Sequence, residues 1–412
     1  MGNAAITSTI DLSQGLPHTE KNTEHGVSQE QKLQYAVSGM RGFRQYMEDQ
    51  HLACTSVPVE GQPIDCLNDH SLFAVFDGHG GRLAAEFCST NFLKILSKRR
   101  ELSAYVQLNK IGSKSRCDTN GISLLKGALG NAFLELDEEL IQMQQAINEE
   151  HRPAREARAQ AKADATGIPQ PVLLAERSGT TCVMVLLTPS HIICANAGDS
   201  RAILRRNGRV LPLSFDHKPA DIPEKLRVVN AGGEVKSKRI DGDLAVSRAL
   251  GDHIYKTDSE RKKIEQKVIS APDVTVYPRN HLGDEFVVLA CDGVWDIASN
   301  QECSEFIQSL LNSGVADLAN VCEESLDTCL ERNSRDNLTL LMVGLPGMKV
   351  DRSKSGIVSQ AMWGQRRARR ARQYFTSAAC AAGMKMVGNN IGGNEVKSIH
   401  SPTAGTASAV AL

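Results

Sequence analysis

The sequence has 412 residues, a net charge of −1 and a hydrophobic fraction of 41%. This length allows one large domain or two or three small ones, and this apolar share supports a substantial core, which excludes global disorder. No apolar run approaches the ~18–20 residues that a membrane-spanning helix requires, so we do not expect an integral membrane protein.

Two further features predict an intracellular chain. The first eight residues have neither the basic segment nor the apolar segment of a secretory signal. The eleven cysteines are odd in number and form no C-x-x-C pair. This pattern favours scattered reduced thiols over a disulfide framework or a zinc site.

The charge is unevenly distributed along the chain. Residues 349–412 contain ten lysines and arginines against two acidic residues, a net charge of +8, which leaves −9 for the rest of the chain. An acidic folded part does not favour nucleic acid as its partner. It suits a site built from carboxylates that recruits cations.

The residue pattern predicts alternating strands and helices between two irregular ends. Residues 1–32 are polar and aperiodic, which predicts a flexible, disordered N-terminal arm. Segments of β-forming residues bounded by turn residues predict strands at 72–76, 180–187, 191–195, 201–205, 285–291 and 338–343. Helices are predicted near 80–98, 122–149, 222–231, 300–313 and 315–332.

The links between these elements vary in length and composition. The three residues Thr-Pro-Ser at 188–190 join two predicted strands, and a link this short favours antiparallel pairing. Residues 141–176 predict a charged insertion, an exposed helix followed by a Pro-containing loop. Residues 348–412 predict a basic, low-complexity and mostly disordered tail, so that 33–347 is the folded domain.

Acidic residues lie where predicted strands begin or end. Apolar strands run directly into Asp77 and Asp292, each followed by Gly, and Asp336 comes just before another strand. One Asp-Gly pair is most often an ordinary turn, but two of them together with Glu48-Asp49 form a recurring pattern. Carboxylates gathered at one edge of a core repel one another unless a cation neutralises them. Oxygen ligands without His or Cys clusters select Mg²⁺ or Mn²⁺ over zinc.

With these motifs the chain resembles the metal-dependent serine/threonine protein phosphatases of the PPM, or type 2C, family. The resemblance covers about residues 33–346 and keeps the family's motif order throughout. It includes Phe73-Ala-Val-Phe-Asp-Gly-His-Gly-Gly81, Leu289-Ala-Cys-Asp-Gly-Val-Trp-Asp296 and Ser334-Arg-Asp-Asn337, together with 42–51, 178–181, 197–201, 216–219, 230–235 and 244–252. One such segment would be weak evidence, whereas nine in series are specific.

The resemblance implies an α+β fold and a metal centre. The fold is a four-layer αββα sandwich with helices on both sides of two central antiparallel sheets, formed by a catalytic domain at 33–347. Two ions, Mg²⁺ or Mn²⁺, would occupy a cleft at one end of the sandwich. Asp77 would bridge both ions, Glu48 and the Gly78 carbonyl would complete one site, and Asp292 and Asp336 would complete the other.

Further positions are implied around this centre. Asp199 and Asp296, with Asp292, resemble a weaker third metal site. Asp49 would lie behind the metal ligands and orient metal-bound waters. Residues 214–240 match a flap that borders the cleft, where the sequence affects substrate choice more than chemistry.

Two residues match catalytic positions of the family. Arg44 matches the arginine that holds phosphate, since a planar guanidinium grips phosphate oxygens in a bidentate way. A surface salt bridge is the alternative for Arg44. His79 matches the proposed general acid, and capping of the helix that follows it is the structural alternative.

The resemblance implies hydrolysis of phosphoserine and phosphothreonine in proteins, with a water that bridges the two cations as nucleophile. The alternative is a catalytically weak phosphoprotein-binding regulator, a pseudophosphatase or scaffold, although every expected ligand position is filled. Another metal hydrolase, such as a nuclease, would use the same carboxylates but should show a basic groove, and the folded part is acidic.

Partners of the tail and location are predicted from weaker patterns. The basic stretch 365–372 would be a signal read by an import receptor, a site for acidic lipid or a solvated stretch without a partner. Gly2 follows Met1, but Ile6 occupies the position where the myristoylation pattern requires Ser or Thr. We expect a monomer in the cytoplasm, the nucleus or both, with membrane association as a minor alternative.

Overall fold

The computed structural model describes residues 16–111, 119–166 and 177–354. The predictions for residues 1–15, for the end of the insertion at 167–176 and for 355–412 therefore lie outside the described residues. These include Gly2 and the basic stretch 365–372. None of the helices in the described ranges is both long and apolar enough to cross a bilayer.

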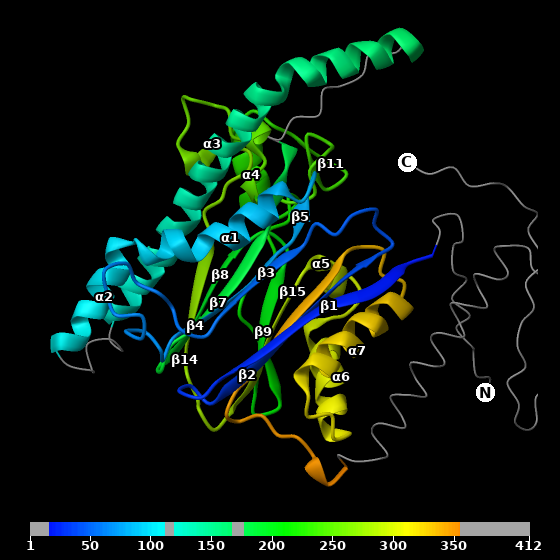
Figure 1. Cartoon of the computed structure of the whole chain (residues 1–412). Helices are drawn as coiled ribbons and strands as arrows, with labels where there is room; N and C mark the ends of the chain where they lie inside the picture. Colours follow the sequence, from blue (N-terminus) through cyan, green and yellow to red (C-terminus); the bar gives the residue numbers. More distant parts are fainter. Residues whose placement is uncertain (1–15, 112–118, 167–176, 355–412) are drawn as a thin grey trace, which may run out of the picture. The chain divides into compact units, whose positions relative to one another are not determined.

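Two antiparallel sheets form the centre of the structure (Figure 1). The six-stranded sheet has the order β1 (His18–Ser28), β2 (Leu33–Gly42), β16 (Leu338–Gly344), β15 (Asp284–Ala290), β9 (Arg201–Arg206) and β10 (Arg209–Pro212). The five-stranded sheet has the order β14 (Asp273–Pro278), β8 (His191–Ala197), β7 (Cys182–Leu187), β4 (Ser71–Phe76) and β3 (Gln50–Cys54). All six strands predicted from the sequence lie in these sheets.

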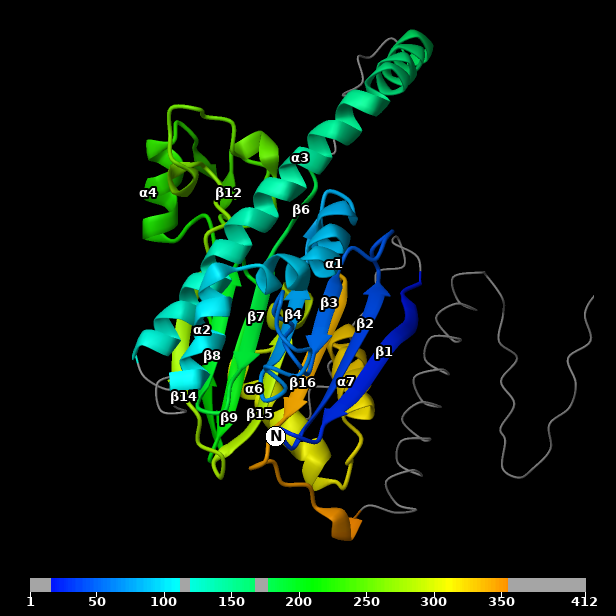
Figure 2. The same ribbon diagram turned by 60° about the vertical axis from the view of Figure 1, so that its left-hand side comes forward.

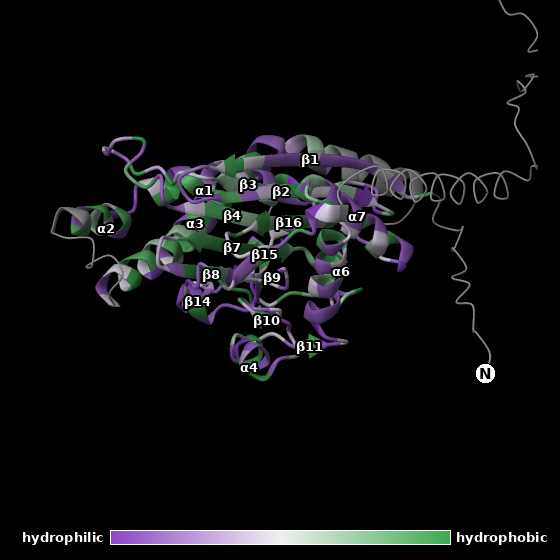
Figure 3. Ribbon diagram, turned by 90° about the horizontal axis from the view of Figure 1, so that it is seen from below, coloured by the Kyte–Doolittle hydropathy of each residue, from purple (hydrophilic) through white to green (hydrophobic). Residues whose placement is uncertain are grey.

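The apolar runs of the central strands bury both of their faces. In β4, Phe73 and Val75 belong to the core between the two sheets, whereas Leu72, Ala74 and Phe76 belong to the core under the helices. This division follows the two-residue alternation of side chains along a strand. Seen end-on, the central strands are hydrophobic and the edge strands β1 and β14 are hydrophilic (Figure 3).

Helices cover the outer face of each sheet (Figures 1 and 2). On the five-stranded sheet lie α1 (Leu83–Ser97), α2 (Arg100–Ile111) and α3 (Thr119–Thr166). On the six-stranded sheet lie α6 (Asn300–Asn312) and α7 (Leu318–Glu331). The predicted α+β sandwich, with two antiparallel sheets between helices, is confirmed. The remaining short helices are α5 (Asp292–Trp295) and the 3₁₀ turns η4 (His253–Tyr255), η5 (Lys263–Glu265) and η6 (Arg352–Lys354).

The prediction of a flexible arm over residues 1–32 is wrong for 18–28, which form β1. Eight of its residues pair in continuous register with β2, from Lys21 opposite Met40 to Ser28 opposite Leu33. Its side chains are mostly polar, and Lys21 pairs with Asp327 on α7. Backbone hydrogen bonds and polar contacts hold this edge strand, so the sequence lacks the apolar alternation that predicts strands.

Helix α3 is longer than the predicted helix at 122–149. It extends through residues 141–166 of the predicted charged insertion, so this part is helical, as expected. In Figures 1 and 2 its C-terminal part extends beyond the sheets and the other helices. Its N-terminal part is anchored by buried apolar residues, among them Phe133, Leu136 and Leu140. The contacts continue into the charged segment as far as Met143, which packs against the same core, and Asn148, which is buried. Beyond them the sequence of the projecting part offers few apolar side chains to pack.

Two small sheets lie beside the sandwich. A three-stranded sheet is formed by β5 (Gly78–His79), β6 (Gly179–Thr180) and β13 (Leu250–Gly251). The flap contains α4 (Ile222–Asn230) and the hairpin of β11 (Val235–Lys236) and β12 (Arg239–Ile240). Its small apolar cluster consists of Val228, Ile240, Val246, Ala249 and Val268.

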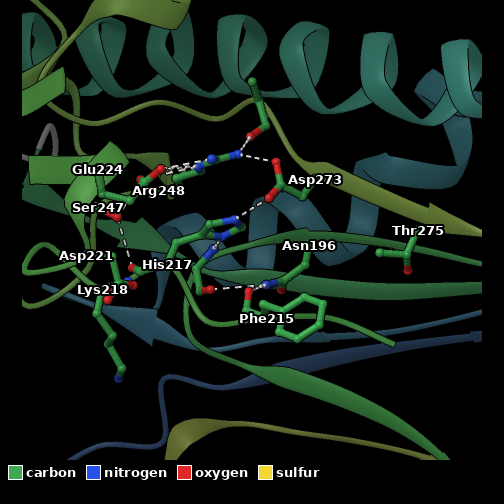
Figure 4. Close-up of polar contacts among 12 residues, drawn as sticks. Asn196, Phe215, His217, Lys218, Asp221, Glu224, Ser247, Arg248, Asp273 and Thr275 are labelled. Atoms are coloured by element: carbon green, nitrogen blue, oxygen red, sulfur yellow. Dashed lines mark hydrogen bonds and ion pairs between the residues drawn. The ribbon is translucent and has the colours of Figure 1, made fainter. Parts of the chain in front are cut away.

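A network of ion pairs, buried at Glu224 and exposed at Asp273, joins the flap to the sandwich (Figure 4). Glu224 of α4 accepts hydrogen bonds from Arg248 and from Ser247 Oγ, at 2.8 and 2.6 Å. Arg248 also donates to Asp273 of β14 at 2.7 Å. Asp273 in turn accepts from His217, so one carboxylate on β14 contacts both a flap residue and the Arg248 that binds Glu224. With so small an apolar cluster, the flap depends on these charged contacts.

Replacing Glu224 with Gln should destabilise the flap at pH 7 by about 3 kcal/mol and have little effect near pH 2. Burial raises the pKa of Glu224, but hydrogen bonds from Arg248, Arg227 and Ser247 outweigh it and lower the pKa to about 2. Because the folded pKa lies below the unfolded one, this stabilisation is present above about pH 4.5 and is lost as the pH falls towards 2.

Hydrogen exchange of the α4 amides at matched pH measures this effect. The exposed Glu234→Gln variant on the same flap is the control and should change α4 protection little. A loss of protection in Glu224→Gln that is equal at pH 7 and pH 3 would contradict the charge network, because it would indicate a steric defect.

Candidate metal centre and active-site cleft

A cavity of about 670 Å³ opens at the end of the sandwich where the acidic motifs meet. Asp77 follows β4 directly, Asp199 lies two residues after β8, and Asp292 begins α5 two residues after β15. Asp336 and Glu48 come two residues before β16 and β3. Because neighbouring strands are antiparallel, these ends and beginnings lie at the same edge of the sheets.

The structure brings all but one of the predicted site residues to the cavity wall. The predicted residues that line it are Arg44, Glu48, Asp77, Gly78, His79, Asp199, Asp292, Asp296 and Asp336. The exception is Asp49, which is buried behind the wall. The remaining cavity wall includes Lys218 and Asp252, to which the sequence analysis gave no role.

The carboxylates are close enough to repel one another. Asp77, Asp199 and Asp292 each place one oxygen within 4.8 Å of the other two. Burial raises the pKa of Asp77 well above its usual value, and the charge of Asp292 raises it further. Burial, followed by the charges of Asp199 and Asp336, raises the pKa of Asp292 to about 8. In the described part of the chain, neither Asp77 nor Asp292 forms an ion pair with Lys or Arg.

These residues fit a hard divalent cation. The acidic side chains of the cavity wall offer only oxygen atoms, which are the ligands that Mg²⁺ and Mn²⁺ prefer. Cys291 lies beside Asp49 and Asp77, but burial raises the pKa of its thiol well above its usual value. One thiol beside two carboxylates lacks the imidazole and paired thiolate ligands of typical zinc sites, so this group fits a hard cation better.

Asp49 has one satisfied and one unsatisfied oxygen. Its Oδ2 accepts a hydrogen bond from Thr339 Oγ1 at 2.7 Å, whereas its buried Oδ1 has no partner among the described residues. Burial raises the pKa of Asp49 to about 6. A buried oxygen without a donor suits a bound water, and the role of Asp49 in orienting metal-bound waters stays a prediction.

Glu48 and Gly78 are brought together by close backbone packing. A side chain on Gly78 would place its Cβ 2.3 Å from the carbonyl oxygen of Glu48, so only glycine fits there. Glu48 Oε1 accepts the Gly81 amide at 3.1 Å, and the Glu48 amide donates to Asn337 Oδ1 at 2.9 Å. These bonds hold the Glu48 carboxylate at the cavity wall.

Two cationic side chains contact acidic residues of the cavity. Arg44 Nη2 lies 2.6 Å from Asp336 Oδ2 at the mouth of the cavity, and the Arg44 side chain is 58% exposed. Lys218, on the flap, pairs with the buried Asp199. Burial raises the pKa of Asp199 and the charge of Lys218 lowers it, with a net increase. Lys218 lies in the matched motif Asp216-His-Lys-Pro219, and this motif is the sequence feature that could have pointed to the contact.

His79 contacts a carboxylate that the sequence analysis did not identify. Its Nε2 lies 2.6 Å from Oδ2 of Asp252, the last residue of a matched motif. Burial lowers the pKa of His79 but the charge of Asp252 raises it, with a net increase. The helix-capping alternative for His79 is not supported, because Ser178 Oγ accepts the Ala84 amide at the start of α1.

Comparison with known proteins shows similarity over the folded part of the chain. The family described as Protein phosphatase 2C matches residues 33–338. Human protein phosphatase 1B is 38% identical over 327 residues, which are 79% of this chain and 60% of that protein. Human protein phosphatase 1A is 35% identical over 330 residues, which are 80% of this chain and 75% of that protein.

Two solved structures share the fold. A phosphatase from a pathogenic strain of Toxoplasma gondii has a TM-score of 0.57 at 23% identity and covers 81% of this chain and 97% of its own. A sex-determining protein of C. elegans has a TM-score of 0.53 at 22% identity and covers 75% of this chain and 64% of its own. Both are similar to this chain in fold.

Replacing Asp292 with Asn should raise the melting temperature of the protein in excess chelator, more at pH 8.5 than at pH 5.5. The folded pKa of about 8 lies above that of an unfolded aspartate, so the metal-free fold loses stability as the pH rises from about 4 to 8. The Asp292→Asn substitution removes this negative charge and therefore removes the loss of stability at high pH.

Thermal unfolding in chelator and in Mg²⁺ measures both effects, with the exposed Asp65→Asn as control. The Asp292→Asn variant should also gain less from Mg²⁺ than the wild type, because it lacks a ligand. A variant less stable than the wild type in chelator at pH 8.5 would show that Asp292 is stabilising without a cation.

Proposed function

The chain belongs to the protein phosphatase 2C family, and we propose that it hydrolyses the phosphate esters of phosphoserine and phosphothreonine in proteins. The observation that supports this most is the set of partly or fully buried, mutually repelling carboxylates at the wall of one cavity. All of them lie inside the matched region. The curated relatives supply a phosphatase activity, and this chain spans about 60% of the length of human protein phosphatase 1B.

We assign two ions, Mg²⁺ or Mn²⁺, to the carboxylates as the family resemblance implies. Asp77 would contact both ions, Glu48 and the Gly78 carbonyl would hold one, and Asp292 and Asp336 would hold the other. Asp199 and Asp296, with Asp292, would form a weaker third site. When bound, the ions neutralise charge on the phosphoryl group and lower the pKa of the water that attacks it.

The chain's own side chains would bind the phosphoryl group and supply a proton. Arg44 has a fork of donors at the mouth of the cavity, and an arginine fork matches two phosphoryl oxygens. Binding there requires the guanidinium to share or leave its contact with Asp336. His79 lies deeper in the cavity wall and would donate a proton to the leaving serine or threonine oxygen.

A covalent intermediate on cysteine is not supported. Cys291 is the cysteine that lies with Asp49 and Asp77, and its buried thiol has a raised pKa, which disfavours the nucleophilic thiolate. A regulator that binds phosphoproteins without turnover is the second candidate. All the expected ligand positions carry oxygen ligands, which favours the enzyme over this candidate.

Hydrolysis of a phosphoserine peptide should require Mg²⁺ or Mn²⁺ and stop in excess chelator, because the carboxylates need a cation to bind an anionic substrate. Asp77→Asn should be the most damaging single change, since it touches both ions. Phosphate release and calorimetric Mn²⁺ titration measure activity and binding separately. Full activity in chelator, or near-native turnover of Asp77→Asn at saturating metal, would contradict this assignment.

Replacement of Arg44 by Ala should raise KM for a phosphopeptide about tenfold and weaken competitive inhibition by inorganic phosphate. The reason is the loss of a charge-assisted contact to the phosphoryl group. Arg44→Lys keeps the positive charge but loses the bidentate guanidinium, so its KM should lie between those of the wild type and Arg44→Ala. Unchanged KM and phosphate inhibition in Arg44→Ala would show that Arg44 only pairs with Asp336.

A further inference from the structure

The partly exposed His79 and the buried Asp252 form a pair in the wall of the cleft. The His79 Nε2 and Asp252 Oδ2 atoms are 2.6 Å apart, and the Asp252 side chain is 2% exposed. Because a carboxylate can only accept a hydrogen bond, Nε2 carries the shared proton. Nδ1 is then the ring nitrogen that remains for a proton transferred to a substrate. The two residues are 173 positions apart in the sequence.

The surrounding backbone is shaped to hold this pair. The small sheet of β5, β6 and β13 sets His79 opposite Gly179 and Gly179 opposite Gly251, the residue before Asp252. A Cβ on Gly179 would lie 2.3 Å from Asp252 Oδ2 and 2.6 Å from His79 Nε2. Only a glycine at this position leaves room for the contact.

Asp252 itself has an unusual conformation. Its φ of +54° lies in the left-handed region, which a residue with a side chain seldom adopts. The Asp252 amide donates to the Ser178 carbonyl, and the Gly251 amide donates to Asp137 Oδ1 on α3 at 2.7 Å. These bonds hold an unfavourable conformation that aims the carboxylate at His79, a kind of strain that is concentrated at functional sites.

We propose that Asp252 is a positioning residue that fixes the orientation of the His79 ring, so that Nδ1 faces the leaving oxygen of the substrate. The inference rests on the proposed phosphatase function and adds a residue to it. The Asp252 Oδ2 atom is engaged by the His79 ring. Its contact with His79 therefore gives it a role distinct from that of the acidic residues at the centre of the cleft.

Each proton in the proposed step has a donor and an acceptor. A water oxygen forms a bond to phosphorus while the bond between phosphorus and the serine oxygen breaks. The bonding electrons stay on the serine oxygen, which takes the Nδ1 proton of His79. The products are a serine hydroxyl and inorganic phosphate. The imidazole later takes a proton from solvent, which balances the proton lost by the attacking water. Asp252 keeps its charge throughout.

The test compares two substrates whose leaving groups differ in their need for a proton. A serine alkoxide leaves poorly without an acid, whereas p-nitrophenolate leaves readily as an anion. Asp252→Asn should lower kcat for a phosphoserine peptide about 10–1000-fold with KM nearly unchanged. Its loss of kcat on p-nitrophenyl phosphate should be at least tenfold smaller, which also shows that the variant is folded and binds metal.

A double-mutant cycle with His79→Gln separates positioning from a structural role. If Asp252 acts through His79, adding Asp252→Asn to His79→Gln should cause no further loss of kcat on the phosphopeptide. Asp284→Asn is the matched control, a fully buried aspartate that pairs with Arg206 and does not line the cavity. The Asp284→Asn variant should lower the stability of the protein. It should leave the ratio of kcat on the phosphopeptide to kcat on p-nitrophenyl phosphate at the wild-type level.

Failure of the role assigned to Asp252 can be told apart from failure of the proposed phosphatase function. Equal losses on both substrates, or losses that multiply in the double variant, overturn the role assigned to Asp252 while an active wild type retains the proposed function. A wild type that hydrolyses neither substrate with Mn²⁺ overturns the proposed function and the role of Asp252 with it. A selective, non-additive loss supports both.

Discussion

Repulsion between carboxylates at one end of the β sandwich is the constraint that the rest of the structure accommodates. Asp77 directly follows β4, which is buried throughout, and Asp292 comes two residues after β15, which is buried except at Glu285, so packing of the sheets fixes both groups. Charge repulsion is stronger in this partly desolvated place than in water. The apolar core between the sheets offsets that cost, with roughly 1.5–3 kcal/mol for each large side chain buried. The fold thus holds a group of carboxylates whose negative charge is not neutralised within the chain and would be neutralised by a bound cation.

Buried carboxylates elsewhere in the described structure show what is different in the cleft. Glu224 has Arg227 and Arg248, Asp137 has Lys256, and Asp284 has Arg206 as partners. In each of these pairs the chain itself supplies the cationic partner. The contacts with Arg248, Lys256 and Arg206 also join segments that are distant in the sequence. In the cleft, Arg44 pairs with Asp336 and Lys218 pairs with Asp199, whereas Asp77 and Asp292 have no such partner among the described residues. Asp77 and Asp292 therefore remain available to bind a cation from solution. This availability distinguishes the functional cleft from the structural ion pairs.

The sequence predicted the parts of this arrangement that local pattern determines. Apolar runs predicted the central strands, and the aspartates next to them placed the site at one edge of the sheets. Edge strand β1 was missed because its polar residues are held by backbone pairing. The distribution of metal ligands came from the family resemblance. The contact between His79 and Asp252 depends on three short strands and a glycine from distant segments, and no local pattern predicts such a meeting.

The most direct test of the account is a crystal structure of the Mn²⁺-loaded protein with anomalous scattering measured at the manganese edge. The account predicts two neighbouring anomalous peaks, both in contact with the carboxylate of Asp77, with Glu48 beside one and Asp292 beside the other. A cleft without manganese, or ions bound only away from Asp77, would contradict the claim that these strand ends are built to gather cations.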